Sequence, residues 1–357
     1  MNLTEEEKYR YSRHILLNEI GEKGQEKLKN ARVLVVGAGG LGCPVLLYLT
    51  SAGVGNIGIV DFDKIEESNL QRQILFDTTD IGKPKSTVAK QKLETKNPFV
   101  TIKSYSYELT NKNALEVFQN YDIIVDASDN FTTRYLINDA CLLSKKPLIY
   151  GAIHKFEGQI SVFNYQNGPN YRCLFPNPPE EIPSCSEVGV LGVLPGIIGS
   201  LQANEVLKLI LEIGSVLSGE ILIYNALETS FLTINLKKTS SLSSFGINTK
   251  EVYENYDYQS FCNSKKVTEI TKLEFDNLPQ ESIVLDVREL HELPRLENKN
   301  LLLIPMNSIP TNLAKIPKND PVYVVCQKGI RSEYVIQFLE KEYQFNNLIN
   351  LKGGVKQ

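Results

Sequence analysis

The stretch that most constrains the fold is GAGGLG, residues 37–42. It follows the apolar run VLVV and precedes CPVLLYLTSAG, whose apolar spacing is typical of a helix. Glycines at such a turn let the backbone bend tightly between a strand and the helix that packs on it. The following run, NIGIVDFD, is typical of another strand. A strand, a helix and a strand in this order predict a parallel sheet covered by helices.

The same alternation continues further along the chain. YDIIVDAS at residues 121–128 predicts a strand, residues 132–143 a helix, and PLIYGAI a further strand. The later runs GQISVFNY, EILIYNA and TSFLTINL are typical of antiparallel strands, and residues 196–214 have helical spacing. We predict a Rossmann-like α/β domain over residues 1–240 with a mixed, mainly parallel sheet.

A second, smaller domain is expected at the C-terminal end. Residues 241–265 are polar, rich in Ser and Asn, and without a sustained period, which favours a linker. Residues 266–357 contain the apolar runs VLDVR, NLLLIPM, VYVVC and NLINLKGG, together with the helix-like EYVIQFLEKEY. This alternation predicts a small separate α/β domain.

Charge and hydropathy patterning exclude several classes of partner. The formal net charge is -4, from Lys+Arg 38 and Asp+Glu 42, so no basic excess is available for nucleic acid or an anionic membrane surface. The N-terminal MNLTEEEKYRYSRHI has no signal-peptide apolar core, and no apolar run reaches the ~18 residues of a membrane span. We therefore expect a cytoplasmic protein that binds neither nucleic acid nor membrane.

The 6 cysteines have irregular spacing, which is typical of free thiols in a reducing compartment rather than of a disulfide framework. Cys43 and Cys141 fall inside apolar helical patterns and are expected to be buried and inert. Cys185 and Cys326 instead lie in loops beside Gly, Ser or Pro. These two are the candidates for chemistry.

The glycine-rich turn is also a candidate phosphate loop. At the start of a helix, free N–H groups and the helix dipole favour a negative ligand that the glycines allow to approach closely. Asp61 ends the following strand, where a carboxylate can accept hydrogen bonds from a ribose. This pattern alone fits either a nicotinamide dinucleotide or ATP. The loop glycines are Gly37, Gly39, Gly40 and Gly42.

Charged residues after the loop favour ATP. They are Arg72 in NLQRQ, Lys85 in GKPKS and Asp129 in DASDN. Arginine and lysine can hold a triphosphate and stabilise charge on a transferred phosphoryl group, and an aspartate can position Mg²⁺. A hydride-transfer enzyme would instead need a neutral or apolar pocket for the nicotinamide. The set therefore points to adenylyl transfer.

Residues 9–214 closely resemble the ThiF/MoeB family, the bacterial relatives of ubiquitin-activating enzymes. The resemblance implies an enzyme that uses ATP to adenylate the C-terminal glycine of a small ubiquitin-like sulfur-carrier protein ending in Gly-Gly, with release of pyrophosphate. The matching stretches are RYSRHI, VLVVGAGGLGCPVLLYLTSAGVGNIGIVDFD, NLQRQILF, GKPKSTVAK, DASDNFTTRYLIND, YRCLF and SCSEVGVLGVLPGIIGSLQANEVLK.

The resemblance also implies roles for single residues. Asn69, Arg72 and Lys85 match the family's phosphate contacts, and Asp129 matches its Mg²⁺ ligand. Arg13 matches the arginine that reaches the ATP of the other subunit, which implies a homodimer. The positions that match the phosphate loop and the ribose site are Gly39, Gly42 and Asp61.

One feature of the family is missing. Many relatives bind a structural zinc through two C-x-x-C pairs, but here Asn170 takes the first ligand position of NYRCLF and only Cys173 remains. Residues 236–250, where the second pair would lie, contain no cysteine, and Cys262 is isolated. Because structural zinc needs four ligands, we expect no zinc.

The C-terminal loop CQKGIR places Arg331 five positions after Cys326, between a strand and a helix. Backbone N–H groups of such a loop can stabilise an anion on sulfur, and Arg331 can either secure the loop or bind an anionic substrate. Sulfurtransferases and cysteine phosphatases both use this device, and the short loop favours the former. Residues 283–354 resemble a rhodanese domain, with VLDVRE near its start and LKGG near its end. The usual His-Ile-Pro-Gly segment is replaced by HELPRLENKNLLLIPMNSI.

Joined together, the two ends predict one pathway. A persulfide on Cys326, charged by a donor such as a cysteine desulfurase, attacks the carrier adenylate. Cys185 matches the cysteine that in relatives forms a carrier thioester or accepts a disulfide, and could release a carrier thiocarboxylate for a molybdopterin, thiamine or tRNA-thiolation type of pathway. Two alternatives stay open: an NAD-dependent oxidoreductase with an accessory sulfur domain, and a non-catalytic scaffold that binds the carrier.

Overall fold

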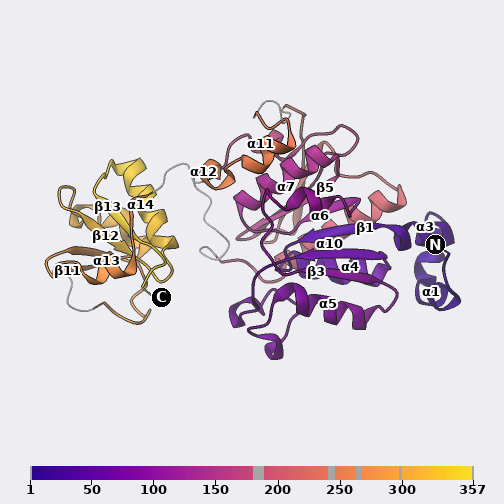
Figure 1. The fold of residues 1–357 in the computed structure, drawn as a ribbon, viewed down its shortest axis with the longest axis horizontal. Helices are drawn as coiled ribbons and strands as arrows, with labels where there is room; N and C mark the ends of the chain where they lie inside the picture. The colour runs from indigo at the N-terminus through magenta and orange to yellow at the C-terminus, as the bar shows by residue number, and fades with distance from the viewer. Residues whose placement is uncertain (1, 180–188, 240–245, 263–266, 297–299, 356–357) are drawn as a thin grey trace. The chain divides into compact units, whose positions relative to one another are not determined.

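The computed structural model describes residues 2–179, 189–239, 246–262, 267–296 and 300–355. The chain divides into two compact units, Met1–Cys262 and Asn263–Gln357 (Figure 1). Each unit has its own sheet and its own hydrophobic core. The two are described separately below.

The N-terminal unit is built on an 8-stranded sheet with the order β3-β2-β1-β4-β5-β6-β7-β8. The first five strands in this order, β3, β2, β1, β4 and β5, pair in parallel. Strands β6, β7 and β8 are added in antiparallel pairs. The sheet is therefore mixed and mainly parallel, which confirms the expected fold class. The strands are β1 (Arg32–Val36), β2 (Asn56–Val60), β3 (Thr101–Tyr105), β4 (Ile123–Asp126), β5 (Leu148–His154), β6 (Glu157–Phe163), β7 (Glu220–Asn225) and β8 (Ser230–Asn235).

Helices cover both faces of this sheet, because its central strands are apolar on both sides. Val33 and Val35 of β1 pack with α3, α4, α5 and α10, whereas Leu34 and Val36 pack with α6, α7 and α8. The helices are α1 (Glu5–Arg10), α2 (Ser12–Ile15), α3 (Gly21–Asn30), α4 (Gly42–Ala52), η1 (Glu67–Asn69), η2 (Thr78–Asp80), α5 (Lys85–Lys96), α6 (Ala114–Phe118), α7 (Phe131–Ser144), α8 (Tyr171–Leu174), α10 (Leu194–Leu211), α11 (Lys250–Asn255) and α12 (Tyr258–Cys262).

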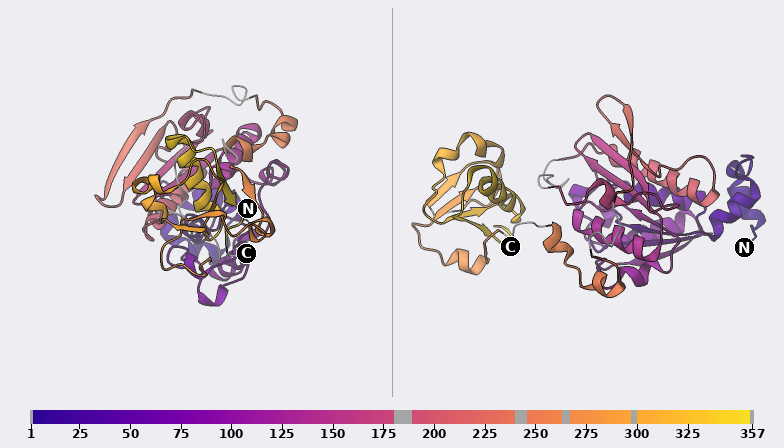
Figure 2. Two further views of the ribbon diagram at one scale, coloured as in Figure 1. Left: turned by 90° about the vertical axis from the view of Figure 1, so that its left-hand side faces the viewer. Right: turned by 90° about the horizontal axis from the view of Figure 1, so that it is seen from above.

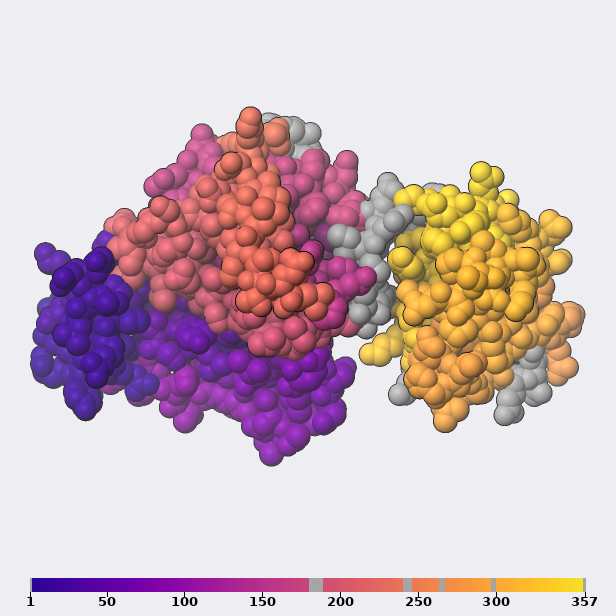
Figure 3. All heavy atoms as spheres, turned by 180° about the vertical axis from the view of Figure 1, so that it is seen from behind, coloured from indigo at the N-terminus to yellow at the C-terminus, as the bar shows by residue number. Residues whose placement is uncertain are grey.

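The edges of the N-terminal unit are exposed. Every residue of the edge strand β8 is exposed, and Figure 2 shows the β7–β8 hairpin extending from the body of the unit. The N-terminal helices α1 to α3, coloured indigo, lie together at one end of the same unit (Figure 3). Along the described ranges, none of the helices combines the length and apolar character needed to cross a bilayer.

Residues 250–262 differ from the linker expected over 241–265. They form α11 and α12, and the side chains of Tyr253 and Tyr258 are buried in the core on the α7 side of the sheet. Tyr253 donates from its hydroxyl to the carbonyl of Leu136 on α7, at 3.3 Å. Burial of two tyrosines therefore ties this polar stretch to the N-terminal unit, while the domain boundaries themselves stay predictions.

The C-terminal unit is a parallel 5-stranded sheet with the order β11-β10-β12-β13-β9. Its central strands β10 and β12 are buried and apolar, as expected for a sheet covered on both faces. The elements are β9 (Glu269–Ile270), α13 (Lys272–Asp276), β10 (Ile283–Asp286), β11 (Asn300–Leu303), η4 (Met306–Thr311), η5 (Leu313–Lys315), β12 (Val322–Val325), α14 (Ile330–Tyr343) and β13 (Leu348–Leu351).

Candidate functional site

A pocket lies at the carboxyl ends of the parallel strands β1, β2 and β4. This edge is where open α/β sheets bind their ligands, because the loops that leave the strands diverge there. The pocket is lined by Val36, Gly37, Gly39, Gly40, Leu41, Val60, Asp61, Phe62, Asp63, Arg72, Gln73, Lys85, Glu108, Leu109, Ala127, Ser128, Asp129, Asn130, Thr133, Arg134 and Ile153.

The glycine loop forms the pocket floor between β1 and α4. Gly37 has φ +98, and a Cβ there would lie 2.6 Å from the carbonyl oxygen of Ala127. A Cβ on Gly42 would lie 2.0 Å from the carbonyl oxygen of Gly37, so this position also requires glycine. Gly39 and Gly40 line the pocket itself, whereas Gly42 lies behind the turn. The loop is thus tight and open to a ligand on one side.

Asp61 follows β2 and is held by the backbone. One carboxylate oxygen accepts the N–H of Ala38 at 2.7 Å, and the other accepts the N–H of Asp63 at 2.9 Å. Burial raises the pKa of the Asp61 carboxyl above its usual value, against the opposing effect of the nearby Lys85 cation. Each oxygen keeps a further lone pair that can accept a hydrogen bond from a ribose hydroxyl.

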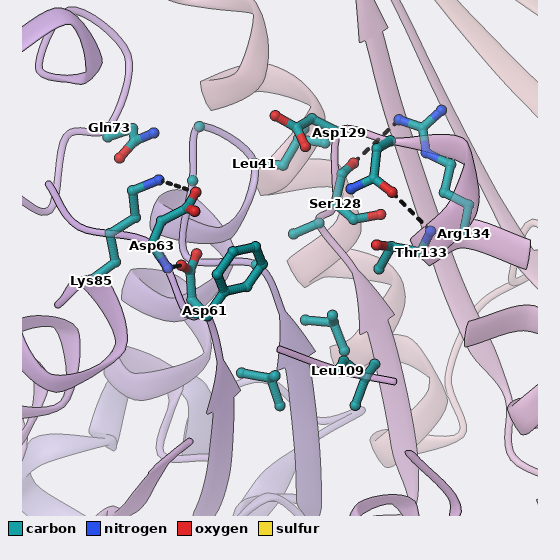
Figure 4. Close-up of a pocket in the computed structure, with 18 of the residues that line it drawn as sticks. Leu41, Asp61, Asp63, Gln73, Lys85, Leu109, Ser128, Asp129, Thr133 and Arg134 are labelled. Atoms are coloured by element: carbon teal, nitrogen blue, oxygen red, sulfur yellow. Dashed lines mark hydrogen bonds and ion pairs between the residues drawn. The ribbon is translucent and has the colours of Figure 1, made fainter. Parts of the chain in front are cut away.

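Lys85 begins α5 and points into the pocket, where its ammonium contacts Asp63 at 2.9 Å (Figure 4). The two partners differ in exposure: the Lys85 side chain is 7% exposed and the Asp63 side chain 53%. A buried cation whose counter-ion faces solvent can exchange that partner for an anionic ligand.

Arg72 and Gln73 line the pocket from the segment after η1. Arg72 donates to the carbonyl oxygen of Ser68 at 3.0 Å and is only partly exposed. Asn69, a predicted phosphate contact, is not among the lining residues, because its amide oxygen accepts the N–H of Glu66 and caps η1. Arg13 likewise lies outside the pocket of its own chain, exposed on α2.

Asp129 and Arg134 form the opposite wall, after β4 and on α7 (Figure 4). Asp129 is exposed, whereas Arg134 is buried and donates to the carbonyl oxygen of Ser128 at 3.2 Å. The exposed carboxylate of Asp129 fits Mg²⁺, because Mg²⁺ bound with a nucleotide typically takes one or two carboxylates and leaves its other positions to phosphates and water.

The polar residues of the pocket that sequence reasoning missed include Asp63, Gln73 and Arg134. Asp63 could have been found, since it lies two positions after Asp61 in DFD. Arg134 carries no such local signal, because a charged residue inside a helical pattern is usually expected to face solvent.

The predicted sulfur loop lies between β12 and α14 of the C-terminal unit. Cys326 is buried, and its sulfur accepts the N–H of Gly329 at 3.2 Å and the hydroxyl of Ser332 at 3.4 Å. Gly329 has φ +86, which turns its N–H inward. Arg331 is paired with Glu292, which the sequence did not single out. The structure therefore gives the sulfur one backbone N–H and one hydroxyl as neighbours, and the cradle of several backbone N–H groups expected from the sequence stays a prediction.

The region of the missing zinc ligands is held by other contacts. Cys173 accepts the N–H of Thr239 at 3.4 Å, and the neighbouring Arg172 forms a fully buried ion pair with Asp139 at 2.7 Å. Throughout the described residues, no group of three His, Cys, Asp or Glu side chains could hold a metal ion. The expected absence of zinc stays a prediction. Cys185 lies outside the described residues.

Comparison with known proteins identifies both parts of the chain. The model of the ThiF family matches residues 11–244, and that of the rhodanese-like domain matches residues 271–357. The chain belongs to the ThiF family. The family resemblance predicted from the motifs is thereby confirmed, as is the rhodanese domain that follows.

Relatives of this ThiF protein include chains with the same two parts. The probable adenylyltransferase/sulfurtransferase MoeZ of Mycobacterium tuberculosis is 40% identical over 373 residues, covering 99% of this chain and 93% of the relative. The adenylyltransferase and sulfurtransferase MOCS3 of Dictyostelium discoideum is 40% identical, covering 93% of this chain and 78% of the relative. The sulfur carrier protein adenylyltransferase of Thermus thermophilus is 50% identical over 73% of this chain and 99% of the relative.

Solved structures show the fold at greater distance. The crystal structure of E. coli MccB with ATP has a TM-score of 0.56 and 24% identity, covering 64% of this chain and 71% of that chain. The full-length relatives establish the enzyme class: this ThiF protein is an adenylyltransferase and sulfurtransferase. That class excludes the NAD-dependent oxidoreductase and the non-catalytic scaffold.

Proposed function

We propose that the enzyme adenylates the C-terminal glycine of a small ubiquitin-like sulfur-carrier protein and then converts it to a thiocarboxylate with sulfur from Cys326. One observation carries the proposal: a single chain joins a phosphate-loop pocket with cationic walls to a cysteine surrounded by hydrogen-bond donors. The name of the Thermus thermophilus relative, a sulfur carrier protein adenylyltransferase, supports a sulfur carrier as the substrate.

In the first half-reaction, a carboxylate oxygen of the carrier bonds to the α-phosphorus of ATP while the bond to the departing pyrophosphate breaks. Asp61 accepts hydrogen bonds from the ribose, and N–H groups at Gly39 and Gly40 receive the phosphates. Lys85 and Arg72 offset the repulsion between the carboxylate and the triphosphate. Asp129 would hold Mg²⁺, which supplies further charge neutralisation when bound.

A homodimer completes this half-reaction in our proposal. Arg13 is exposed and lies outside its own pocket, as expected of a residue that serves the other subunit. An apolar groove between α4 and α10 offers the surface for a second copy. Its exposed side chains include Tyr48 at 57%, Ile74 at 61% and Val193 at 60%.

In the second half-reaction, a persulfide on Cys326 attacks the carbonyl carbon of the carrier adenylate. A carbon–sulfur bond forms, the bond to the phosphate oxygen breaks, and AMP leaves with the electron pair. The N–H of Gly329 stabilises the anionic sulfur before the attack, and the hydroxyl of Ser332 can turn its proton from Asn350, at 2.6 Å, to the sulfur at 3.4 Å. The product is an acyl disulfide between carrier and Cys326.

Cys185 then resolves that acyl disulfide. Its thiolate bonds to the sulfur of Cys326, and the carrier thiocarboxylate leaves with the electrons of the broken sulfur–sulfur bond. A dithiol reductant afterwards reduces the disulfide between the two cysteines. A protein persulfide, such as that of a cysteine desulfurase, would recharge Cys326, and the carrier used decides between a molybdopterin, thiamine or tRNA-thiolation type of pathway.

Exchange of labelled pyrophosphate into ATP tests the proposal. The full-length enzyme with Mg²⁺ should catalyse exchange only when a carrier with a free Gly-Gly terminus is present. The matched control is the same carrier without its last glycine, which should support none. Equal exchange with both carriers, or exchange without any carrier, would show that the C-terminal glycine is not the acceptor.

A further inference from the structure

Glu292 lies beside the sulfur loop although it is 39 positions away from Arg331 in the chain. Its two carboxylate oxygens accept one hydrogen bond each from the two terminal nitrogens of Arg331, at 2.7 and 2.6 Å. One of these oxygens also accepts the N–H of Glu289 at 2.8 Å. The guanidinium is therefore held by both oxygens of a carboxylate that is itself fixed to the backbone.

The segment that carries Glu292 is tied to the loop at a second point. Gln327 donates to the carbonyl oxygen of Leu293 at 3.3 Å and accepts from Arg288 at 3.2 Å. Arg288 is fully buried and forms an ion pair with Asp286 at 2.7 Å. Hydrogen bonds to the backbone therefore hold the segment of Glu292 beside the loop of Arg331. The ion pair thus differs from one between two exposed side chains, which must lose conformational freedom to meet.

Charge at this pair persists over the working range of pH. The hydrogen bonds from Arg331 lower the pKa of Glu292 to about 2. Glu292 in turn raises the pKa of Arg331 through the same hydrogen bonds. The guanidinium of this loop arginine is therefore charged, and the carboxylate bound to it offsets that charge.

We propose that Glu292 is a positioning and specificity-determining residue of the sulfurtransferase: it fixes Arg331 within the loop that carries Cys326 and weakens the binding of small dianionic sulfur donors. This inference rests on the proposed role of Cys326. Arg331 then secures the loop and does not capture an anion, which decides between the two roles left open by the sequence. Glu292 belongs to the segment HELPRLENKNLLLIPMNSI, which replaces the usual His-Ile-Pro-Gly.

Thiosulfate provides the probe, because it is a small dianion. The Cys326 thiolate attacks its outer sulfur, a sulfur–sulfur bond forms on the enzyme, and sulfite leaves with the electron pair. Cyanide then takes the outer sulfur as thiocyanate and restores the thiolate. In Glu292→Gln the neutral amide no longer offsets the charge of Arg331. The KM for thiosulfate should therefore fall by about tenfold, which corresponds to about 1.4 kcal/mol and to the lower end of the range for a hydrogen bond to a charged group.

The matched control is Glu289→Gln, which removes the same charge three positions away and keeps the backbone N–H that Glu292 uses. Its KM for thiosulfate should stay within about twofold of wild type, because the carboxylate described on Arg331 is that of Glu292 and not that of Glu289. Glu292→Asp keeps the carboxylate and should restore most of the wild-type KM. Pyrophosphate exchange by the N-terminal unit should be unchanged in all three variants.

Several outcomes decide the matter. An unchanged or higher KM in Glu292→Gln, or an equal fall in Glu289→Gln, would overturn the inference. If Cys326→Ala keeps thiosulfate:cyanide activity, the proposed function of the loop fails instead, so the two failures can be told apart.

If Glu292→Gln does not fold, a second measurement on wild-type enzyme tests the inference. The KM of the wild-type enzyme for thiosulfate should be no lower than its KM for the monoanion methanethiosulfonate. A strong preference for thiosulfate would mean that Arg331 is free to bind it.

Discussion

The two candidate sites each contain a cation paired with a carboxylate, but the pairs differ. In the N-terminal pocket, Lys85 makes one contact at 2.9 Å with Asp63, whose side chain is 53% exposed. In the C-terminal loop, Arg331 makes two contacts at 2.7 and 2.6 Å with Glu292, whose side chain is only 20% exposed. The first pair can be exchanged for a ligand, whereas the second is retained.

This difference matches the chemistry proposed for each site. A triphosphate brings several negative charges that need cationic partners, so a solvent-facing counter-ion that the triphosphate can displace suits this site. A persulfide sulfur needs a fixed cradle of donors, and the paired Arg331 keeps the loop in one shape around it. Variants that remove one site should therefore leave the other active, which gives the first two predictions.

The largest effect is expected for the sulfur nucleophile. Cys326→Ala should abolish both thiosulfate:cyanide sulfurtransfer and carrier thiocarboxylate formation, because no other group in the loop can carry the sulfur. Carrier-dependent pyrophosphate exchange should stay near wild type, since adenylation precedes any use of sulfur. Mass spectrometry of the carrier measures the thiocarboxylate.

The control for that variant is Cys262→Ala, which removes a partly exposed cysteine outside the loop. It should keep sulfurtransfer and thiocarboxylate formation. Normal thiocarboxylate production by Cys326→Ala with a persulfide donor would refute the scheme, because the sulfur would then have to arrive by another thiol.

A smaller loss is expected in the nucleotide pocket. Arg72→Ala and Asp129→Ala should each slow pyrophosphate exchange by about a hundredfold, since loss of a charge-stabilising group typically costs roughly 3 kcal/mol of transition-state stabilisation. Thiosulfate:cyanide sulfurtransfer should be unaffected. Lys83→Ala is the matched control. Lys83 is an exposed cation close in sequence to Lys85, but it does not line the pocket. Undiminished exchange in both variants would remove the assignment of this site.

Local sequence was enough for the parts of the fold that depend on neighbouring residues. VLVV followed by GAGGLG forms β1, the turn and α4 as expected, because apolar periodicity and glycine act within one turn of chain. The spacing of Cys326 and Arg331 likewise indicated the sulfur loop. In each case the signal and the structure lie in the same few residues.

Contacts between distant segments could not be predicted in this way. The stretch over residues 250–262 is polar, so its sequence favoured a linker. It packs on the N-terminal unit because the side chains of Tyr253 and Tyr258 are buried in the core formed by α7 and the neighbouring strands. Glu292 reaches Arg331 across 39 positions, and nothing in HELPRL distinguishes a paired carboxylate from a solvated one. The sequence therefore indicated the features formed by neighbouring residues, and it did not indicate contacts between residues that are distant in the chain.

The retained pair should also appear in the pH dependence of stability. Arg331 lowers the pKa of Glu292 to about 2, so the pair contributes stability above the ordinary glutamate pKa and loses it as pH falls toward about 2. Relative to wild type, Glu292→Gln should lower stability by about 1 kcal/mol near neutrality, a value limited by solvent screening. The difference in melting temperature should shrink as the pH approaches 3. A difference independent of pH would show that the charge of Glu292 contributes nothing to stability.

The smallest effect is expected for the exchangeable pair. Asp63→Asn leaves Lys85 without its anionic partner and removes a negative charge from the path of the triphosphate, so both changes favour ATP. The KM for ATP should fall by about threefold with kcat little changed, because Asp63 faces solvent and its charge is screened. Asp77→Asn is the control, since Asp77 is an exposed aspartate that pairs with Lys92 at 2.6 Å away from the pocket lining. A rise in the ATP KM would contradict the contrast between the two pairs, because Asp63 would then help to bind the nucleotide and Lys85 would not be exchanging partners.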